Sequence, residues 1–119
     1  MSRRTSRHED GLPPEARLVA RVQEVAVPPL VESIEEHFAG YFNELGITLR
    51  LSARATDEDI IALRNNVLAC LEKATSELAI NFKWLVSMYR GQDQVALIFP
   101  GNSPIPSGHR LELVYESYR

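Results

Sequence analysis

Few side chains in this sequence have both the type and the spacing that chemistry requires. The histidines His8, His37 and His109 lie far apart, and none forms a metal-ligand motif with cysteine or carboxylate neighbours. The single cysteine, Cys70, falls on the apolar side of a helical pattern, where a thiol usually behaves as a small, inert hydrophobe. No serine lies in a Gly-x-Ser-x-Gly elbow, and no phosphate-loop pattern occurs. The sequence therefore predicts no metal site and no cofactor.

The best candidate group for catalysis or ligand binding lies near the end of the chain. His109 can exchange protons near neutral pH and Arg110 can hold an anion, and both follow a loop rich in proline and glycine. Strand alternation would place Arg110 beside Glu112 on one face and His109 beside Tyr115 on the other. Because these side chains do not converge by spacing, we predict no catalytic residues. His109 and Arg110 are kept as a candidate ligand loop, and the sequence favours a non-enzymatic protein without deciding the question.

Length and composition predict one globular domain. The chain has 119 residues, of which 45% are hydrophobic and 24% charged, which is ordinary for a globular protein large enough to bury a core. Its apolar runs are too short to span a bilayer, and no apolar segment follows the basic N-terminus as a signal peptide requires. We therefore expect a cytoplasmic protein that does not engage a membrane. We expect residues 1–12 to form a disordered basic arm ahead of a single domain over residues 13–119.

The charge is close to balanced but uneven along the chain. Thirteen basic and 16 acidic residues give a formal net charge of -3, which makes no general case for nucleic-acid binding. Arg3, Arg4 and Arg7 nevertheless lie together without an acidic neighbour in residues 1–8. With the basic residues of the predicted sheet they support an alternative hypothesis, a small domain that binds nucleic acid or cleaves RNA.

Three segments have the periodicity of amphipathic helices. The first covers residues 14–26 and opens on prolines that suit a first helical turn. The second covers residues 29–45, where apolar side chains from Val31 to Leu45, Phe38 and Tyr41 among them, recur at steps of three and four. The third follows Thr56, which can form a capping box with the acidic residue three positions later. We expect this helix to end near Asn81.

One residue interrupts the apolar face of the third helix. Arg64 projects between leucines of that face, and two interpretations remain open. It can lie at the edge of the core and extend its charged end to water. Otherwise it forms an ion pair with an acid such as Glu35, or an anion site.

Four segments have the pattern of strands. Side chains alternate strictly over residues 47–54 and residues 82–89, and shorter patterns follow at residues 95–99 and 110–118. The element order α-α-β-α-β-β-β predicts an α+β, two-layer sandwich with a four-stranded, mostly antiparallel sheet and the helices packed on one face. The strand order is not determined by the sequence, although the β-α-β step allows one parallel pair.

The side of the sheet opposite the core alternation is the predicted interaction surface. It mixes charged, aromatic and aliphatic groups, which a purely solvated face would not need. The predicted members are Arg50, Arg54, Lys83, Leu85, Tyr89, Glu112, Val114 and Glu116. Either the first helix folds across part of this face or a second subunit covers it, and we prefer the second interpretation. The sequence thus predicts a protein-interaction module, acting as an adaptor, an inhibitor or a chaperone-like factor and forming a homodimer.

Overall fold

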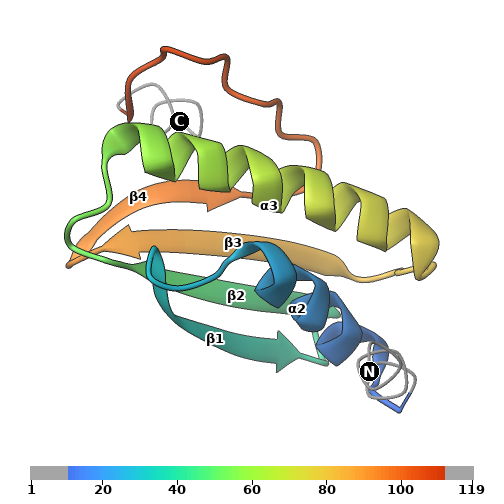
Figure 1. Cartoon of the computed structure of the whole chain (residues 1–119). Coiled ribbons are helices and arrows are strands. Elements are labelled where there is room, and N and C mark those ends of the chain that lie inside the picture. The colour runs from blue at the N-terminus through green and yellow to red at the C-terminus, as the bar shows by residue number, and fades with distance from the viewer. Residues whose placement is uncertain (1–10, 112–119) are drawn as a thin grey trace, which may run out of the picture.

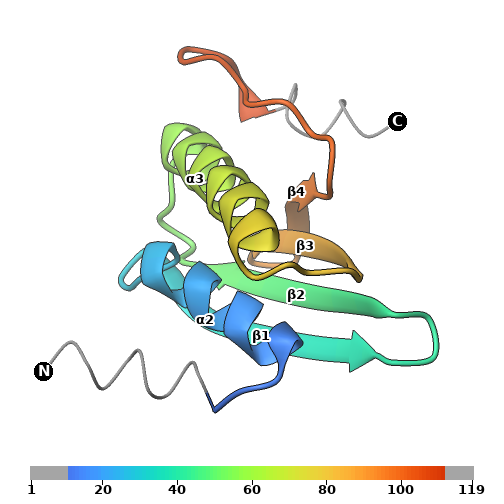
Figure 2. The same cartoon turned by 90° about the vertical axis from the view of Figure 1, so that its right-hand side faces the viewer.

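The computed structural model describes residues 11–111, which form a sheet covered on one face by two helices. The elements are α2 (Pro14–Val25), β1 (Val31–Ala39), β2 (Glu44–Leu51), α3 (Asp57–Glu77), β3 (Lys83–Arg90) and β4 (Asp93–Ile98). The strand order in the sheet is β1-β2-β3-β4, with β2 and β3 parallel and both outer pairs antiparallel. Figures 1 and 2 show α2 and α3 side by side on the same face. The predicted α+β class is confirmed.

Helix α3 begins as its sequence predicts. The Thr56 hydroxyl accepts a hydrogen bond from the Asp59 N–H at 3.1 Å, and the Asp59 carboxylate accepts one from the Thr56 N–H at 3.2 Å. This capping box satisfies two backbone donors that the first helical turn leaves open. The helix ends at Glu77, earlier than expected, because Ala79 adopts the left-handed conformation, with φ 53°, in place of Asn81.

The predicted helix over residues 29–45 is wrong, because this segment forms β1 and the turn into β2. A bulge between Val31 and Ser33 shifts the register by one residue, so Val31 and Ile34 both lie on the helix-facing side. Phe38, four residues after Ile34, lies on the same side, because every second residue of a strand faces the same way. The bulge thus produces the steps of three and four that imitate a helix.

The core lies between this face of the sheet and the two helices. Alternate side chains of β2 and β3 supply its floor, so the alternation predicted for both strands is confirmed. Fully buried residues of the core include Leu18, Val22, Leu45, Ile47, Leu49, Ile60, Val67, Leu71, Val86 and Met88. The hairpin predicted to reach residues 95–99 forms β3 and β4.

The element order differs from the prediction at two places. The second helix is replaced by β1, which joins β2, β3 and β4 to complete the four strands. Of the strand predicted over residues 110–118, Arg110 and Leu111 are not in the sheet, and the remainder lies outside the described residues. Within residues 11–111 the order is therefore α-β-β-α-β-β.

Candidate interaction surface and loop pocket

The face of the sheet opposite the helices carries a continuous polar contact across three strands. Arg50 of β2 lies beside Tyr89 of β3 in the parallel register, and its guanidinium carbon is 5.3 Å from the Tyr89 ring centroid. Its Nε donates to the carboxylate of Glu35 on β1 at 2.9 Å. Both charged side chains are about half exposed, at 48% and 57%, so this pair contributes at most about 1 kcal/mol to folding. Its main effect is to hold Arg50 in one orientation.

Apolar side chains complete this outer sheet face, by which we mean the surface around Glu35, Arg50, Leu85, Tyr89 and Leu97. Leu85 lies opposite Gly46, whose lack of a side chain leaves one flank of Leu85 open. Leu97 of β4 is paired with Ser87 and is half-buried. These residues remain partly exposed although their types favour burial.

Of the eight residues of the predicted interaction surface, four share this face, one lies off it and three lie outside the described residues. Arg50, Lys83, Leu85 and Tyr89 occupy alternate positions of β2 and β3, as predicted. Arg54 does not belong to the face, because β2 ends at Leu51 and Arg54 lies in the turn before α3. The other predicted members, Glu112, Val114 and Glu116, lie outside the described residues, as do Arg3, Arg4 and Arg7.

The position of α2 answers the question of whether the first helix covers this surface. Leu18, Val19 and Val22 of α2 are buried in the same core as the inward residues of β2. Figure 2 shows α2 and α3 together on one side of the sheet and no described helix on the other side. Within residues 11–111, no helix therefore covers the outer sheet face.

Arg64 is buried and holds the loop that follows β4. It is only 1% exposed, so the prediction of an edge residue reaching water is wrong. Glu35 is not its partner either, since that carboxylate binds Arg50 on the opposite face. Arg64 Nη1 donates to the carbonyl of Ser103 at 2.5 Å and to Asn65 Oδ1 at 3.1 Å.

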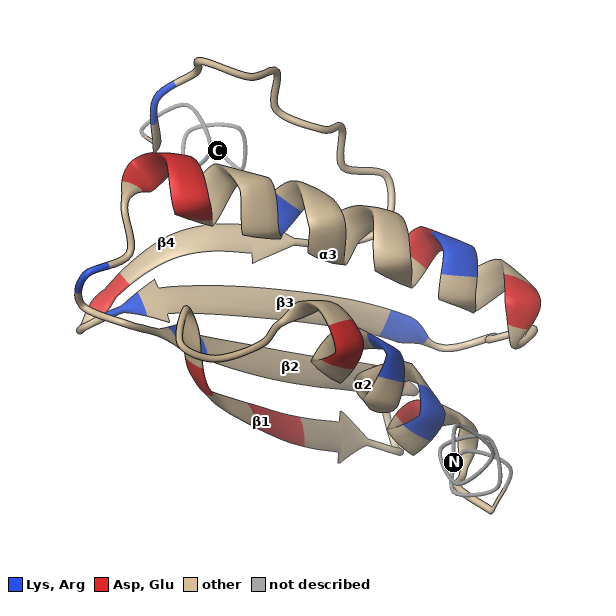
Figure 3. Cartoon of the chain, in the orientation of Figure 1, with Lys and Arg blue, Asp and Glu red and all other residues tan. Residues whose placement is uncertain are grey.

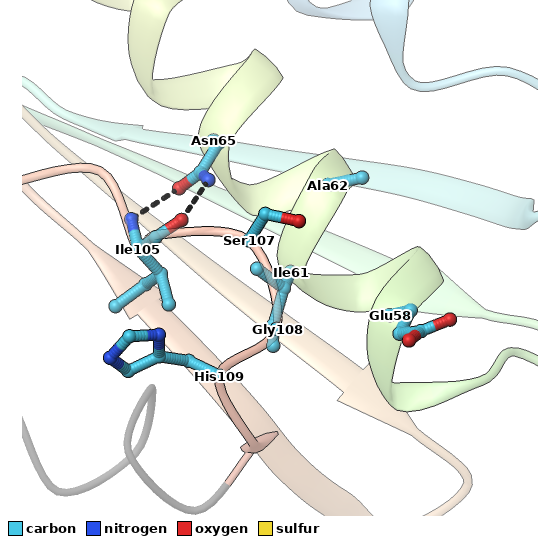
Figure 4. Close-up of a pocket in the computed structure, with 8 residues that line it drawn as sticks. All are labelled: Glu58, Ile61, Ala62, Asn65, Ile105, Ser107, Gly108 and His109. Atoms are coloured by element: carbon cyan, nitrogen blue, oxygen red, sulfur yellow. Dashed lines mark hydrogen bonds between the residues drawn. The ribbon is translucent and has the colours of Figure 1, made fainter.

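Asn65 holds the same loop through both backbone groups of Ile105. Its Nδ2 donates to the Ile105 carbonyl at 2.8 Å, and its Oδ1 accepts from the Ile105 N–H at 3.0 Å (Figure 4). The Asn65 amide thus makes the two backbone hydrogen bonds that a neighbouring strand would otherwise make with Ile105. Sequence reasoning missed this role because Asn65 falls on the polar side of the helical pattern, where a solvent-facing asparagine looks identical.

A pocket of about 390 Å³ lies between the first half of α3 and this loop. It is lined by Glu58, Ile61, Ala62, Asn65, Ile105, Ser107, Gly108 and His109. Figure 4 places Glu58 and His109 at opposite sides, with Ile61 between them, so they do not form an acid–base pair. Among residues 11–111, no cluster of three or more metal-ligating side chains occurs. The pocket therefore has room for a small molecule but no converging reactive groups.

Cys70 faces α2 and is partly buried. Its Sγ lies 3.3 Å from the Arg21 carbonyl, to which the thiol donates. Burial, and then the nearby Glu24 carboxylate, raise the pKa of the Cys70 thiol, while Arg21 and Lys73 partly oppose them. A raised pKa keeps the thiol protonated at neutral pH, which agrees with an inert side chain and disfavours a nucleophile.

The turn between β1 and β2 exposes two aromatic rings from the segment that was predicted to form an amphipathic helix. Tyr41 is 93% exposed and Phe42 is 69% exposed. Their rings meet edge to face, with centroids 5.1 Å apart. The helical pattern was misleading here, because in the hairpin both residues lie in the turn that links the two strands.

None of the helices in residues 11–111 has the length and apolar character needed to cross a membrane. Comparisons of the chain with protein-family models, with curated proteins and with solved structures gave no match.

Proposed function

We propose that this chain is a non-enzymatic protein-interaction module that pairs with a second copy of itself through the outer sheet face. The observation that supports this most is the position of both helices on one face, which leaves Leu85, Tyr89 and Leu97 partly exposed on the other. A surface that combines aromatic, aliphatic and arginine groups has the composition of protein interfaces. An adaptor, an inhibitor or a chaperone-like factor would use such a surface.

The charges on this face suit a twofold partner. A homodimer interface must be complementary to itself, so each charge needs its opposite on the same patch. Glu35 and Arg50, which are joined by a hydrogen bond, are such a pair of opposite charges on this face. Their contact, with the Tyr89 ring on the other side of Arg50, orders the guanidinium before binding and so lowers the entropy lost on association.

The alternative nucleic-acid hypothesis gains no further support from the described residues. On the sheet, acidic and basic residues are interspersed (Figure 3). Arg50 is matched by Glu35, and Lys83 lies opposite Glu44 in the strand register. A phosphate backbone requires a concentration of positive charge, which this face does not have.

The oligomeric state tests the proposal directly. We expect sedimentation analysis over a wide concentration range to show a dimer, and Leu85→Asp to weaken it strongly by placing a carboxylate within the apolar part of the face. Val27→Asp changes an apolar residue that is 47% exposed elsewhere and is the matched control. A wild-type chain that stays monomeric throughout, or a folded Leu85→Asp variant that dimerises normally, would contradict the proposal. Binding to mixed DNA and RNA at low salt would instead favour the alternative.

A further inference from the structure

We infer that the β1–β2 turn is a second docking element, which enters a cleft beside β3 on another copy of the chain. The aromatic knob denotes Tyr41 and Phe42. The aromatic cleft denotes the hollow lined by Glu72, Thr75, Phe82, Lys83, Trp84 and Pro100. This contact lies at the end of the sheet, where Lys83 borders both the cleft and the outer sheet face, and does not depend on the homodimer proposed above.

The knob is presented by a well-ordered turn. The Phe42 N–H donates to the Ala39 carbonyl and the Asn43 N–H to the Gly40 carbonyl, both at 3.1 Å. Asn43 adopts φ 54°, which asparagine tolerates better than most residues. Its carbonyl accepts from the Lys83 N–H at 3.0 Å, so the turn is tied to the start of β3. A rigid aromatic pair loses little conformational entropy when it is buried.

The cleft is suited to receive apolar rings. It has a volume of about 450 Å³ and lies where β4 stops short, since Ile98 pairs with Val86 and the described β4 does not reach Lys83 to Leu85. Trp84 contributes an aromatic wall, and its indole N–H already donates to the Thr75 hydroxyl at 3.2 Å. Because this N–H already has an acceptor, an apolar side chain can fill the cleft without leaving a buried donor unpaired.

The knob and the cleft lie at the same end of the molecule, because Lys83 lines the cleft and also binds the turn. A twofold axis near this end can therefore place each knob in the cleft of the other copy. Glu44 follows the knob and Lys83 borders the cleft, so the reciprocal contact also pairs opposite charges.

The area supports a reciprocal contact between two copies. An aromatic side chain buries about 150–250 Å², so four rings bury roughly 600–1,000 Å². The lining of the cleft adds little to this area, so the total is that of a weak interface, below about 1,200 Å². One knob in one cleft would give only about half of it, which is why the reciprocal contact is favoured.

The first test removes the knob. Tyr41→Ser combined with Phe42→Ser should weaken self-association by about 100-fold or more, since buried aromatic anchors carry much of the free energy of an interface. Val27→Ser, at another exposed apolar position, should have no effect. The measurement is sedimentation equilibrium of the full chain in the Leu85→Asp background, so that association through the outer sheet face does not contribute.

The second test separates direct docking from an indirect effect. Glu72→Trp should fill the chain's own cleft from its rim, whereas Lys73→Trp adds the same ring to an exposed position outside the cleft. In the Leu85→Asp background, knob-less and cleft-filled chains should each be monomeric. A mixture of the two should associate at high concentration, more weakly than the parent chain, since one intact knob meets one open cleft. Lys73→Trp should behave like the parent chain.

Three results would overturn the inference: no association in the Leu85→Asp background, unchanged association without the knob, or a mixture that remains monomeric. If knob removal has no effect while Leu85→Asp abolishes a wild-type dimer, the proposed function stands and the knob contact is wrong. If association in the Leu85→Asp background requires the knob, the knob contact stands. The outer sheet face is then tested in the knob-less chain, where Leu85→Asp should abolish the remaining association, and no effect there would make the outer-face dimer wrong.

Discussion

The hydrogen bonds from Asn65 to the loop after β4, which we call the clamp, offer the sharpest test of how this fold is held together. Replacing Asn65 by alanine removes both hydrogen bonds to the Ile105 backbone and one that Asn65 accepts from Arg64. Asn66, the next residue on α3, is exposed, and Asn66→Ala is a matched control. Both variants gain the same helix propensity, so their difference isolates the clamp.

The magnitude follows from the three lost contacts. A hydrogen bond contributes about 1 kcal/mol net, and a backbone group left unsatisfied in a partly buried site costs about 1–3 kcal/mol. We therefore expect Asn65→Ala to be less stable than Asn66→Ala by about 2–4 kcal/mol. That range is a large share of the stability of a domain of this size.

Urea unfolding followed by circular dichroism measures the difference, and amide hydrogen exchange locates it. The Ile105 N–H should lose protection in Asn65→Ala, because the acceptor on the helix is gone, while protection in β2 should fall only with global stability. If the two asparagine variants differ by less than about 0.5 kcal/mol, the loop is not held by this side chain and the reasoning fails.

Two further predictions concern α3. Thr56→Ala should lower the unfolding free energy by about 1 kcal/mol, because it removes the hydroxyl half of the capping box. Ser76→Ala, at an exposed position of the same helix, should be nearly neutral. Equal effects of the two substitutions in thermal or urea unfolding would contradict this prediction. The raised pKa of Cys70 means that the folded state favours the protonated thiol. Its contribution to stability is therefore full below the ordinary thiol pKa of about 8.5 and is lost as pH rises through the folded-state pKa. The wild-type minus Cys70→Ser difference in unfolding free energy should decline from pH 8 to 10, and a flat difference would refute the direction of the shift.

The fold class was largely accessible from sequence because its strongest signals are local. The capping box at Thr56 and the apolar periodicity of α3 arise from backbone geometry within a few residues, so they predict the helix start directly. The strict alternation that opens at Ile47 predicts β2 for the same reason. The end of α3 was less accessible, because either Ala79 or Asn81 can leave the helix and only the path into β3 selects one.

The candidate surface was partly accessible for a related reason. Alternation assigns Arg50, Leu85 and Tyr89 to the side away from the core, and the structure places them on one face. It could not assign Arg54, because the last residue of a strand depends on where its partner strands stop. The pairing of Glu35 with Arg50 was missed altogether, since residues 29–45 were predicted to form a helix.

Taken alone, the sequence determined the α+β class, the starts of the helices at Pro14 and after Thr56, and the alternation that gives β2 and β3 one buried face. Tertiary structure decided the features whose causes lie far away in the chain. Val31 and Ile34 belong to a strand because β2 supplies backbone partners and a bulge aligns both with the core. Arg64 is buried because a loop 39 residues later brings a carbonyl to it. Tyr41 and Phe42 are exposed because the turn carries them to the end of the sheet, where the described helices do not cover them.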